Sequence, residues 1–474
     1  MIATAKQMDI IDEFKNVVIE YCDSPEVFIE SAGYYLVSAL LGRFYSCPSL
    51  PHGNPNLWIV ISSIPGRCRR SNVQNYTMKV YDKVMRKFAE EKLKNRNNKI
   101  IEQNKKLPPD EQKEVLRLTP KVIKDEINKT KIEAGTPEGI MDYLTGAKPG
   151  EHYTIVSTEF GGVLLTSGGT GYEKGYDTLL CKLAYGEGGK VLLSQRSNTK
   201  GKREVPEGLY VTMFAGMQEP EWYITKKQVR KGLLRRMIIE FVRKNLRWLP
   251  PLRFDRYIMK EQLTSIANKY ILKIQEIEEK LKERQQQTIM ILFAHDVFEE
   301  INNYNKLLDE ELDKHPSDYN IYRQSFWEHL TKLAMCKAIA SSKIMFDEKL
   351  GYHIYVNREH FNEAKKLFDR VSEGCMEAIN SLGLERKNAY THEELLDNLY
   401  NIVYNQPEHK IYGKTKLRRE SKLLQKDFEE IFETLINTNR LQKRIEQPSR
   451  GRPREVIECV IDPDEEENKG WKEY

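Results

Sequence analysis

A short loop between an apolar run and a basic helical segment has residues that could bind phosphate. The run Leu57–Ser62 is followed by a Pro65-Gly66 turn and then by Arg67-Cys68-Arg69-Arg70-Ser71. Phosphate-binding loops join a strand to a helix N-terminus, where backbone N–H groups and a lysine hold the phosphates of ATP and a Ser or Thr hydroxyl binds Mg²⁺. Residues 65–71 are therefore a candidate nucleotide site, with ATP and Mg²⁺ as candidate cofactors.

The loop differs from the pattern G-x-x-x-x-G-K-[ST] at its most important positions. Ser63 and Cys68 replace the two glycines, Arg69 the lysine and Arg70 the hydroxyl residue. A Cβ at position 68 disfavours a positive φ, and Arg is longer and planar where Lys is compact. Only Ser71, after a shift of one residue, could hold Mg²⁺. An ordinary strand-to-helix turn fits the same residues, so a nucleotide-independent protein stays open.

Two later apolar runs also end in polar residues. Tyr153–Ser157 is followed by Thr158-Glu159, which resembles a Walker B strand end whose first acid is missing. Glu159 could polarise the attacking water, and a strand-end glutamate that meets solvent is the alternative. The next run, Leu209–Ala215, leads to Gln218, which could sense the γ-phosphate and joins the candidate nucleotide-binding residues.

Arg235 and Arg236 begin a fourth predicted strand, which extends to Val242. In oligomeric ATPases an arginine supplied by one subunit reaches the nucleotide of its neighbour and stabilises the transition-state charge. Both residues are candidate catalytic groups on this interpretation, and a surface or structural arginine pair is the alternative.

Two basic segments could contact DNA phosphates. A hairpin predicted over 191–205 carries Arg196, Lys200, Lys202 and Arg203 at its tip, where a ring would direct it into the central channel. A solvated basic turn is the alternative.

Residues 391–461 have the pattern of a winged helix-turn-helix, with helices over 391–404, from about 415, and over 424–436, followed by two strands. Lys422 and Lys426 lie near the start of the third helix, and the wing carries the candidates Arg450, Arg452 and Arg454. The third helix also holds four acidic residues, so a protein–protein surface stays open.

The chain as a whole alternates strands and helices and then changes character. We predict an α/β fold with a parallel-sheet core, and nearly all helix after Pro250-Pro251, including one helix over 289–313. Ser24 is predicted to cap an early helix, and a short strand is predicted over 116–120. The expected regions are N-terminal helices (1–50), the core (51–250) with a long basic helical insertion (78–113), a helical lid (251–385), the winged helix (386–461) and an acidic tail (462–474).

Composition limits the class of protein. The 474 residues carry a net charge of +5 and no apolar run long enough to cross a membrane. The seven cysteines lack C-x-x-C spacing, and the first residues lack a signal-peptide pattern. We therefore expect a cytoplasmic protein without a metal-binding cysteine site. Abundant Lys, Glu, Ile, Tyr and Arg indicate a thermophile, such as an archaeon.

Taken in order, these motifs resemble an AAA+/RecA-like primase–helicase-associated domain family of unknown function from phage, plasmid and viral replication genes. The resemblance covers about residues 20 to 380 and rests on Phe28–Leu41, Asn56–Ser71, Thr136–Gly139, Glu159–Gly162, Gly216–Trp222 and Gly232–Arg236. It implies a RecA/AAA+-like core, Glu159 as the Walker B glutamate, and Arg235 or Arg236 as the arginine that acts on a neighbouring subunit.

The expected function is that of a DNA-binding, oligomeric, helicase- or initiator-like protein of a mobile element, with weak or absent ATP hydrolysis. Its expected partners are duplex or single-stranded DNA and further copies of itself in a ring. A nucleotide-independent DNA-binding ring or filament and a winged-helix transcription regulator are the alternatives.

Overall fold

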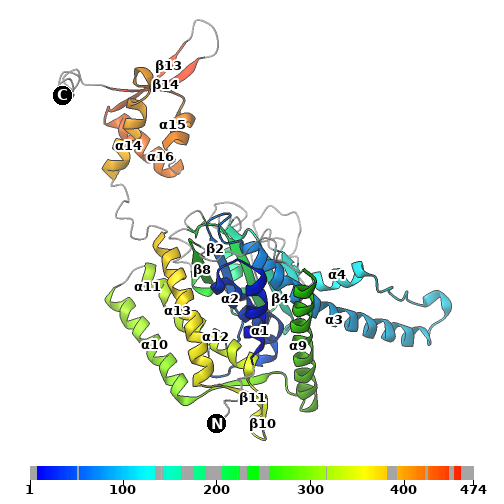
Figure 1. The fold of residues 1–474 in the computed structure, drawn as a ribbon. Helices are drawn as coiled ribbons and strands as arrows, with labels where there is room; N and C mark the ends of the chain where they lie inside the picture. The colour runs from blue at the N-terminus through cyan, green and yellow to red at the C-terminus, as the bar shows by residue number, and fades with distance from the viewer. Residues whose placement is uncertain are drawn as a thin grey trace. The chain divides into compact units, whose positions relative to one another are not determined.

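The computed structural model divides the chain into two compact units, 1–384 and 385–474. It describes residues 8–50, 53–133, 146–161, 176–187, 189–190, 204–220, 232–244, 256–315, 318–381, 392–421, 425–447 and 453–460, and the single positions 140, 143, 144, 164, 223 and 224. The expected N-terminal helices, core and lid share the first unit (Figure 1). The second unit begins one residue before the boundary expected for the winged helix.

A five-stranded parallel sheet forms the centre of the first unit. Its strands lie in the order β3 (Lys131–Glu133), β4 (His152–Ser157), β7 (Tyr210–Met217), β2 (Trp58–Ser63) and β8 (Ile238–Val242). Runs of Val, Ile and Phe form β2, β7 and β8 because strands buried on both faces need continuous apolar sequence. The predicted α/β class and the parallel sheet are confirmed. No pattern in the sequence had predicted β3.

Helices α2 (Glu26–Leu40) and α3 (Arg70–Asn104) cover one face of this sheet. Phe214 of β7 stacks on Tyr35 of α2, and Gly216, two residues further along β7, faces Gln74 of α3. Residues two apart on a strand point to the same face. Helix α1 (Ile10–Tyr21) packs on α2, and its N-cap Asp9 accepts hydrogen bonds from two N–H groups of the first turn.

A mixed sheet that the sequence did not predict joins one early strand of this unit to three strands of its second half. It orders β1 (Tyr45–Ser46), β9 (Ile289–Phe293), β11 (Gly351–Val356) and β10 (Met345–Asp347). The helix predicted over 289–313 is therefore wrong in its first six residues, since α10 begins at His295. Residues 290–293 pair with β11 as a strand because a short apolar run fits either structure and tertiary pairing decides.

Helices surround these sheets. They are α7 (Tyr176–Ala184), α9 (Arg256–Glu283), α10 (His295–Lys314), α11 (Asp318–Arg323), α12 (Phe326–Ser341) and α13 (Arg358–Ser381). Thirteen of the sixteen residues of α12 are buried, so it is a core helix. Asn357 caps the start of α13, where its side-chain oxygen accepts a hydrogen bond from the N–H of His360.

An arm built on the far half of α3 projects from the body (Figure 1). The chain returns beside α3 as an extended segment over 112–119 and then forms α4 (Pro120–Asn128), so the strand predicted over 116–120 is wrong. The side-chain amide of Asn97 both donates to and accepts from the backbone of Leu116, and Asn104 does the same with Lys113. Seven helical residues and three extended residues each span about 10 Å, so the two amides match the returning backbone.

The second unit is a small helical domain closed by a three-stranded antiparallel sheet. Its elements are α14 (His392–Tyr404), β12 (Lys410–Tyr412), α15 (Lys414–Ser421), α16 (Gln425–Asn437), β13 (Leu441–Glu446) and β14 (Arg454–Cys459), with the sheet order β12-β14-β13. It has its own apolar core, which includes Val403, Leu417 and Phe428. The strand β12 was not predicted.

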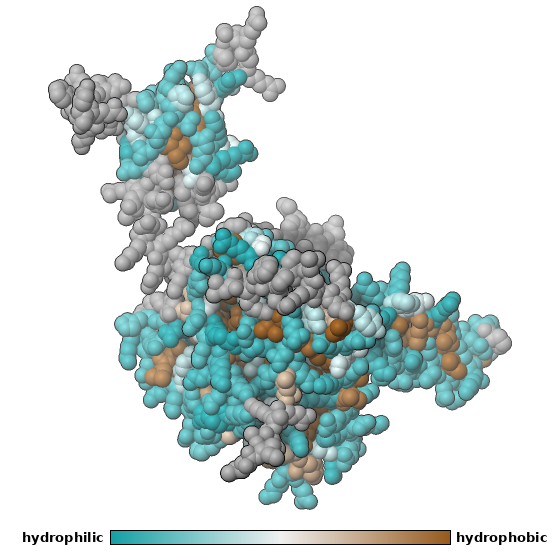
Figure 2. Space-filling model, viewed as in Figure 1, coloured by the Kyte–Doolittle hydropathy of each residue, from teal (hydrophilic) through white to brown (hydrophobic). Residues whose placement is uncertain are grey.

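The surface drawn in Figure 2 is largely hydrophilic, with hydrophobic side chains visible on the arm and in small patches on the body. Among the helices that the structure describes, none is both long and apolar enough to cross a membrane.

Candidate functional site

The predicted phosphate loop lies at the carboxyl edge of the parallel sheet, where the ends of β2, β4, β7 and β8 meet. Ser62 donates a hydrogen bond to the carbonyl of Gln218, just after β7. The side chain of Gln74 in α3 donates to the carbonyl of Ser157 at the end of β4 (2.9 Å). Ligands of open α/β sheets bind in the crevice outside this edge. The structure therefore brings together the loop, the Glu159 segment and Gln218.

Arg69 turns toward the N-terminal helices. It adopts a left-handed conformation (φ 43°). Its Nε lies 3.1 Å from Oδ2 of Asp23, in the segment that connects α1 and α2. Ser24 donates a hydrogen bond to the Arg69 carbonyl (3.0 Å). Ser24 therefore does not cap α2, whose N-cap is Pro25, because its hydroxyl holds the loop. Asp23 and Ser24 were not among the predicted site residues.

Cys68 belongs to the protein core. Its side chain is fully buried, and its thiol faces the carbonyl of Val242 at the end of β8 (3.5 Å). The positive φ angles in the described loop fall on Gly66 and Arg69, so the strain that the sequence suggested for Cys68 lies one residue later. Pro65, Gly66 and Arg67 are exposed at the tip of the loop. Burial of Cys68 fixes the loop to the sheet.

Arg70, the first residue of α3, interacts electrostatically with Glu159. Burial lowers the pKa of Arg70, and the carboxylate of Glu159 opposes that shift. Burial raises the pKa of Tyr223, Glu159 raises it further, and Arg70 lowers it. The Nη1 atom of Arg70 and the hydroxyl of Ser63 are buried without a hydrogen-bond partner among the described residues. The positive charge of Arg70 thus acts on the predicted catalytic carboxylate of Glu159.

Close packing holds the other side of this edge. The hydroxyl of Tyr223 donates to the side-chain oxygen of Gln218 (3.2 Å). A Cβ on Gly161 would lie 2.6 Å from the Tyr223 ring, and one on Gly216 would lie 3.0 Å from the Thr158 carbonyl. Glycine is therefore required at both positions for the two segments to approach. Gln218 is committed to a contact within the chain.

The residues at this edge do not fit a Mg²⁺ ion. Magnesium takes oxygen ligands, usually one or two carboxylates with waters and phosphate oxygens. Here Thr158 replaces one acid, and the guanidinium of Arg70 supplies a positive charge beside the remaining carboxylate of Glu159. Ser71 is exposed at the first turn of α3.

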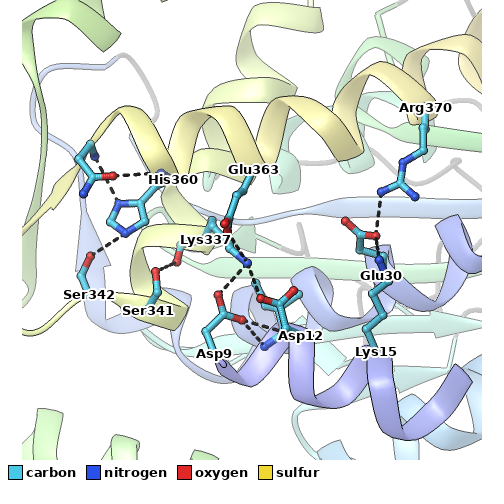
Figure 3. Close-up of polar contacts among 12 residues, drawn as sticks. Asp9, Asp12, Lys15, Glu30, Lys337, Ser341, Ser342, His360, Glu363 and Arg370 are labelled. Atoms are coloured by element: carbon cyan, nitrogen blue, oxygen red, sulfur yellow. Dashed lines mark hydrogen bonds and ion pairs between the residues drawn. The ribbon is translucent and has the colours of Figure 1, made fainter. Parts of the chain in front are cut away.

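A second group of acidic side chains, outside the candidate loop, already binds a lysine. Asp9, Asp12 and Glu363 place carboxylate oxygens within 4.8 Å of one another. The ammonium of buried Lys337 lies between them, at 2.7, 3.0 and 2.8 Å (Figure 3). The group joins α1, α12 and α13 as a partly buried ion network, and it is separate from Glu30, which binds Lys15 and Arg370.

The two candidate arginines of the fourth strand have partners in their own chain. They lie in a short 3₁₀ turn (Leu234–Arg236) just before β8. Arg235 donates to the Gln324 side chain (3.2 Å). Arg236 donates to the Gly232 carbonyl, and its guanidinium lies 4.4 Å from the centre of the Tyr185 ring.

Most of the predicted DNA contacts lie outside the described residues. This holds for Arg196, Lys200, Lys202, Arg203, Lys422, Arg450 and Arg452. The base of the predicted hairpin is present, because β5 (Gly189–Lys190) pairs antiparallel with β6 (Glu204–Val205). Lys426 belongs to the first turn of α16, and Arg454 is exposed at the start of β14.

A basic cluster on α15 was missed. Four of its eight residues are basic, and Lys416 and Arg419 are exposed. On α16, by contrast, the exposed side chains Glu430 and Glu433 are acidic. The signal for this cluster in the sequence is the run Lys414-Thr-Lys-Leu-Arg-Arg, in which four of six residues are basic.

Comparison with known proteins adds no family to this geometry. No protein-family model matches the sequence, and no curated protein matches it either.

Proposed function

We propose that this chain is a DNA-binding protein of a mobile element, with a RecA/AAA+-like core whose ATP hydrolysis is weak or absent, and that it acts in DNA replication or maintenance. Support for the core comes from the all-parallel sheet and from the placement of the candidate loop at its carboxyl edge. In this proposal Arg235 or Arg236 would leave its present partner to reach a neighbouring subunit in a ring.

The placement of Arg69 and Arg70 is the observation that carries the statement about hydrolysis. Hydrolysis needs a cation that reaches the β- and γ-phosphates and a Mg²⁺ ion that neutralises the developing charge. Arg69 is ion-paired to Asp23, and Arg70 places its charge beside Glu159. Arg69 is thus held by a residue of its own chain, and the charge of Arg70 disfavours a Mg²⁺ ion beside Glu159, which favours a protein that works with little or no nucleotide turnover.

The second unit supports DNA binding. Its three helices and the strands β13 and β14 follow one another in the order predicted for a winged helix, and exposed basic residues lie on α15 and at the start of β14. Arg419 and Arg454 are exposed and have no carboxylate within ion-pair distance among the described residues. We propose that α15, more than the acidic face of α16, contacts the phosphates of duplex DNA.

ATP turnover tests the first part. We expect a rate at least about a hundredfold below that of an active motor, which corresponds to roughly 3 kcal/mol of lost transition-state stabilisation. A DNA-stimulated rate of several per second that disappears in Glu159→Gln would overturn this part. Sedimentation with and without DNA tests the ring, and a monomer in both conditions argues against it.

Duplex binding tests the second part. Replacing Arg419 and Arg454 by Ala should weaken binding to all sequences alike. The log–log slope of affinity against salt should fall by the amount expected for about two phosphate contacts. Glu430→Gln and Glu433→Gln serve as the matched control on α16 and should leave binding unchanged or strengthen it. Failure of the wild type to bind duplex DNA at low salt rules out this function.

A further inference from the structure

A cavity of about 680 Å³ is lined in part by Arg69 of the candidate loop. Its walls are the end of α1, the first four turns of α3 and the start of α9. Helix α9 packs along α3 within the same unit (Figure 1). Arg69, which stands where a phosphate loop has its lysine, lines this cavity together with its partner Asp23.

The walls carry an excess of positive charge. Among the described residues that line the cavity, Arg69, Lys79, Lys83 and Lys260 are basic and Asp23 alone is acidic. Among the described residues, no carboxylate lies within ion-pair distance of the three lysines, and Lys83 instead donates to the hydroxyl of Thr264 (2.7 Å). Asp23 is already paired with Arg69, so the three ammonium groups are available to an anion.

The lining of the cavity also includes aromatic and apolar side chains. Two tyrosine rings, Tyr21 and Tyr76, line it together with Met259 and Leu263. The ammonium of Lys79 lies 5.1 Å from the centre of the Tyr76 ring. Sites for single strands combine a positively charged groove that follows the backbone with aromatic side chains on which bases stack.

The side chains of α3 that line the cavity run from Asn72 to Lys83, a rise of about 16 Å. That length exceeds a single nucleotide and suits a short stretch of a strand. We propose that this cavity is a groove for single-stranded DNA, in which Lys79, Lys83 and Lys260 bind phosphates and Tyr76 stacks on a base. The proposal rests on the DNA-binding function proposed above and adds a second surface, which prefers another form of DNA.

Binding of a labelled twelve-nucleotide oligothymidine and of a duplex, both to the full chain, tests the groove. The triple variant Lys79→Ala, Lys83→Ala, Lys260→Ala should bind the single strand at least about tenfold more weakly at low salt. Its log–log salt slope should fall by about 2, since each phosphate contact on a single strand contributes about 0.7. Duplex binding should change less than twofold.

A control variant removes the same charge elsewhere in the first unit. Lys314, Lys349 and Lys366 are exposed, and their replacement by Ala should leave single-strand binding within twofold. At the base-stacking position, Tyr76→Phe should retain binding and Tyr76→Leu should weaken it about tenfold, within the range known for stacked bases. Circular dichroism of each variant checks that it folds.

The two binding measurements, on single-stranded and on duplex DNA, test the groove and the proposed function separately. Duplex binding with single-strand binding that is absent, or that the triple variant leaves unchanged, overturns the groove alone. If the triple variant binds single-stranded and duplex DNA equally more weakly, the proposed preference of the groove for single strands is overturned. Single-strand binding lost only in the triple variant and in Tyr76→Leu supports the groove, even where no duplex is bound. Absence of both kinds of binding overturns the groove and the proposed function together.

Discussion

The buried carboxyl of Glu240 should make the first unit less stable as pH rises. Glu240 lies in β8, opposite Ile61 of β2, and its side chain is 1% exposed. One carboxyl oxygen accepts a hydrogen bond from Ser31 of α2, and the other is buried without a partner among the described residues. Burial raises the pKa of Glu240 from 4.5 to about 8, with the nearby Glu30 adding to the shift, while Ser31 and Arg370 oppose it.

The sign and size of the effect follow from proton linkage. Between pH 4.5 and pH 8 the native state holds this proton and the unfolded state does not, so the free energy of unfolding falls as pH rises. Each pKa unit is worth about 1.4 kcal/mol, which gives a loss of about 3 kcal/mol between pH 5 and pH 8. Glu240→Gln is neutral throughout and keeps an acceptor for Ser31.

Urea titrations of the wild type and Glu240→Gln at pH 5, 6, 7 and 8 measure this loss. Four of the five tryptophans lie before residue 385, so tryptophan fluorescence mainly reports the first unit. The free energy of unfolding of the variant, minus that of the wild type, should rise by about 3 kcal/mol from pH 5 to pH 8. Glu377→Gln, at a side chain 45% exposed, is the control and should change by less than about 0.5 kcal/mol. A constant difference for Glu240→Gln would refute the reasoning.

Three further perturbations address other buried polar groups. Lys337→Met leaves three carboxylates without their cation and should lower the free energy of unfolding at pH 7 by about 3 to 5 kcal/mol in a denaturant titration; a loss under about 1 kcal/mol contradicts this. Burial lowers the pKa of His329 from 6.5 to about 4, so stability should fall as pH decreases through that window, and His329→Gln should abolish this part of the pH dependence. Asn97→Ala should expose the segment 112–119 to trypsin several-fold faster, whereas exposed Asn98→Ala should not.

The central sheet could be predicted because its strands have a distinctive sequence. Apolar runs at 58–63, 210–217 and 238–242 are too continuous for a half-exposed strand and too short for a helix. The three residues of β3 and the two of β1 lack that pattern and are strands only through pairing. The run at 289–293 joins a helical pattern without a break, so its pairing with β11 could not be seen from the sequence.

The loop shows the same limit at the site. Its position between a strand and a helix, and its nearness to Glu159 and Gln218, followed from the order of motifs. The direction of Arg69 did not, because its partner Asp23 lies in another part of the chain and no local pattern links the two. The burial of Cys68 likewise depends on the end of β8. Sequence spacing thus predicts where a loop lies, and tertiary partners decide what its side chains do.

Helix α3 links the candidate loop mechanically to the arm. It runs without interruption for 35 residues, from Arg70 beside the sheet edge to Asn104 near the tip, which is about 52 Å. The backbone clamps made by Asn97 and Asn104 brace its outer half with the returning chain. The helix is therefore a braced lever: a rotation of about 5° at the loop moves the tip by about 4.5 Å over this length. A force on the arm is therefore transmitted along α3 to Arg70 and to the cavity between α3 and α9.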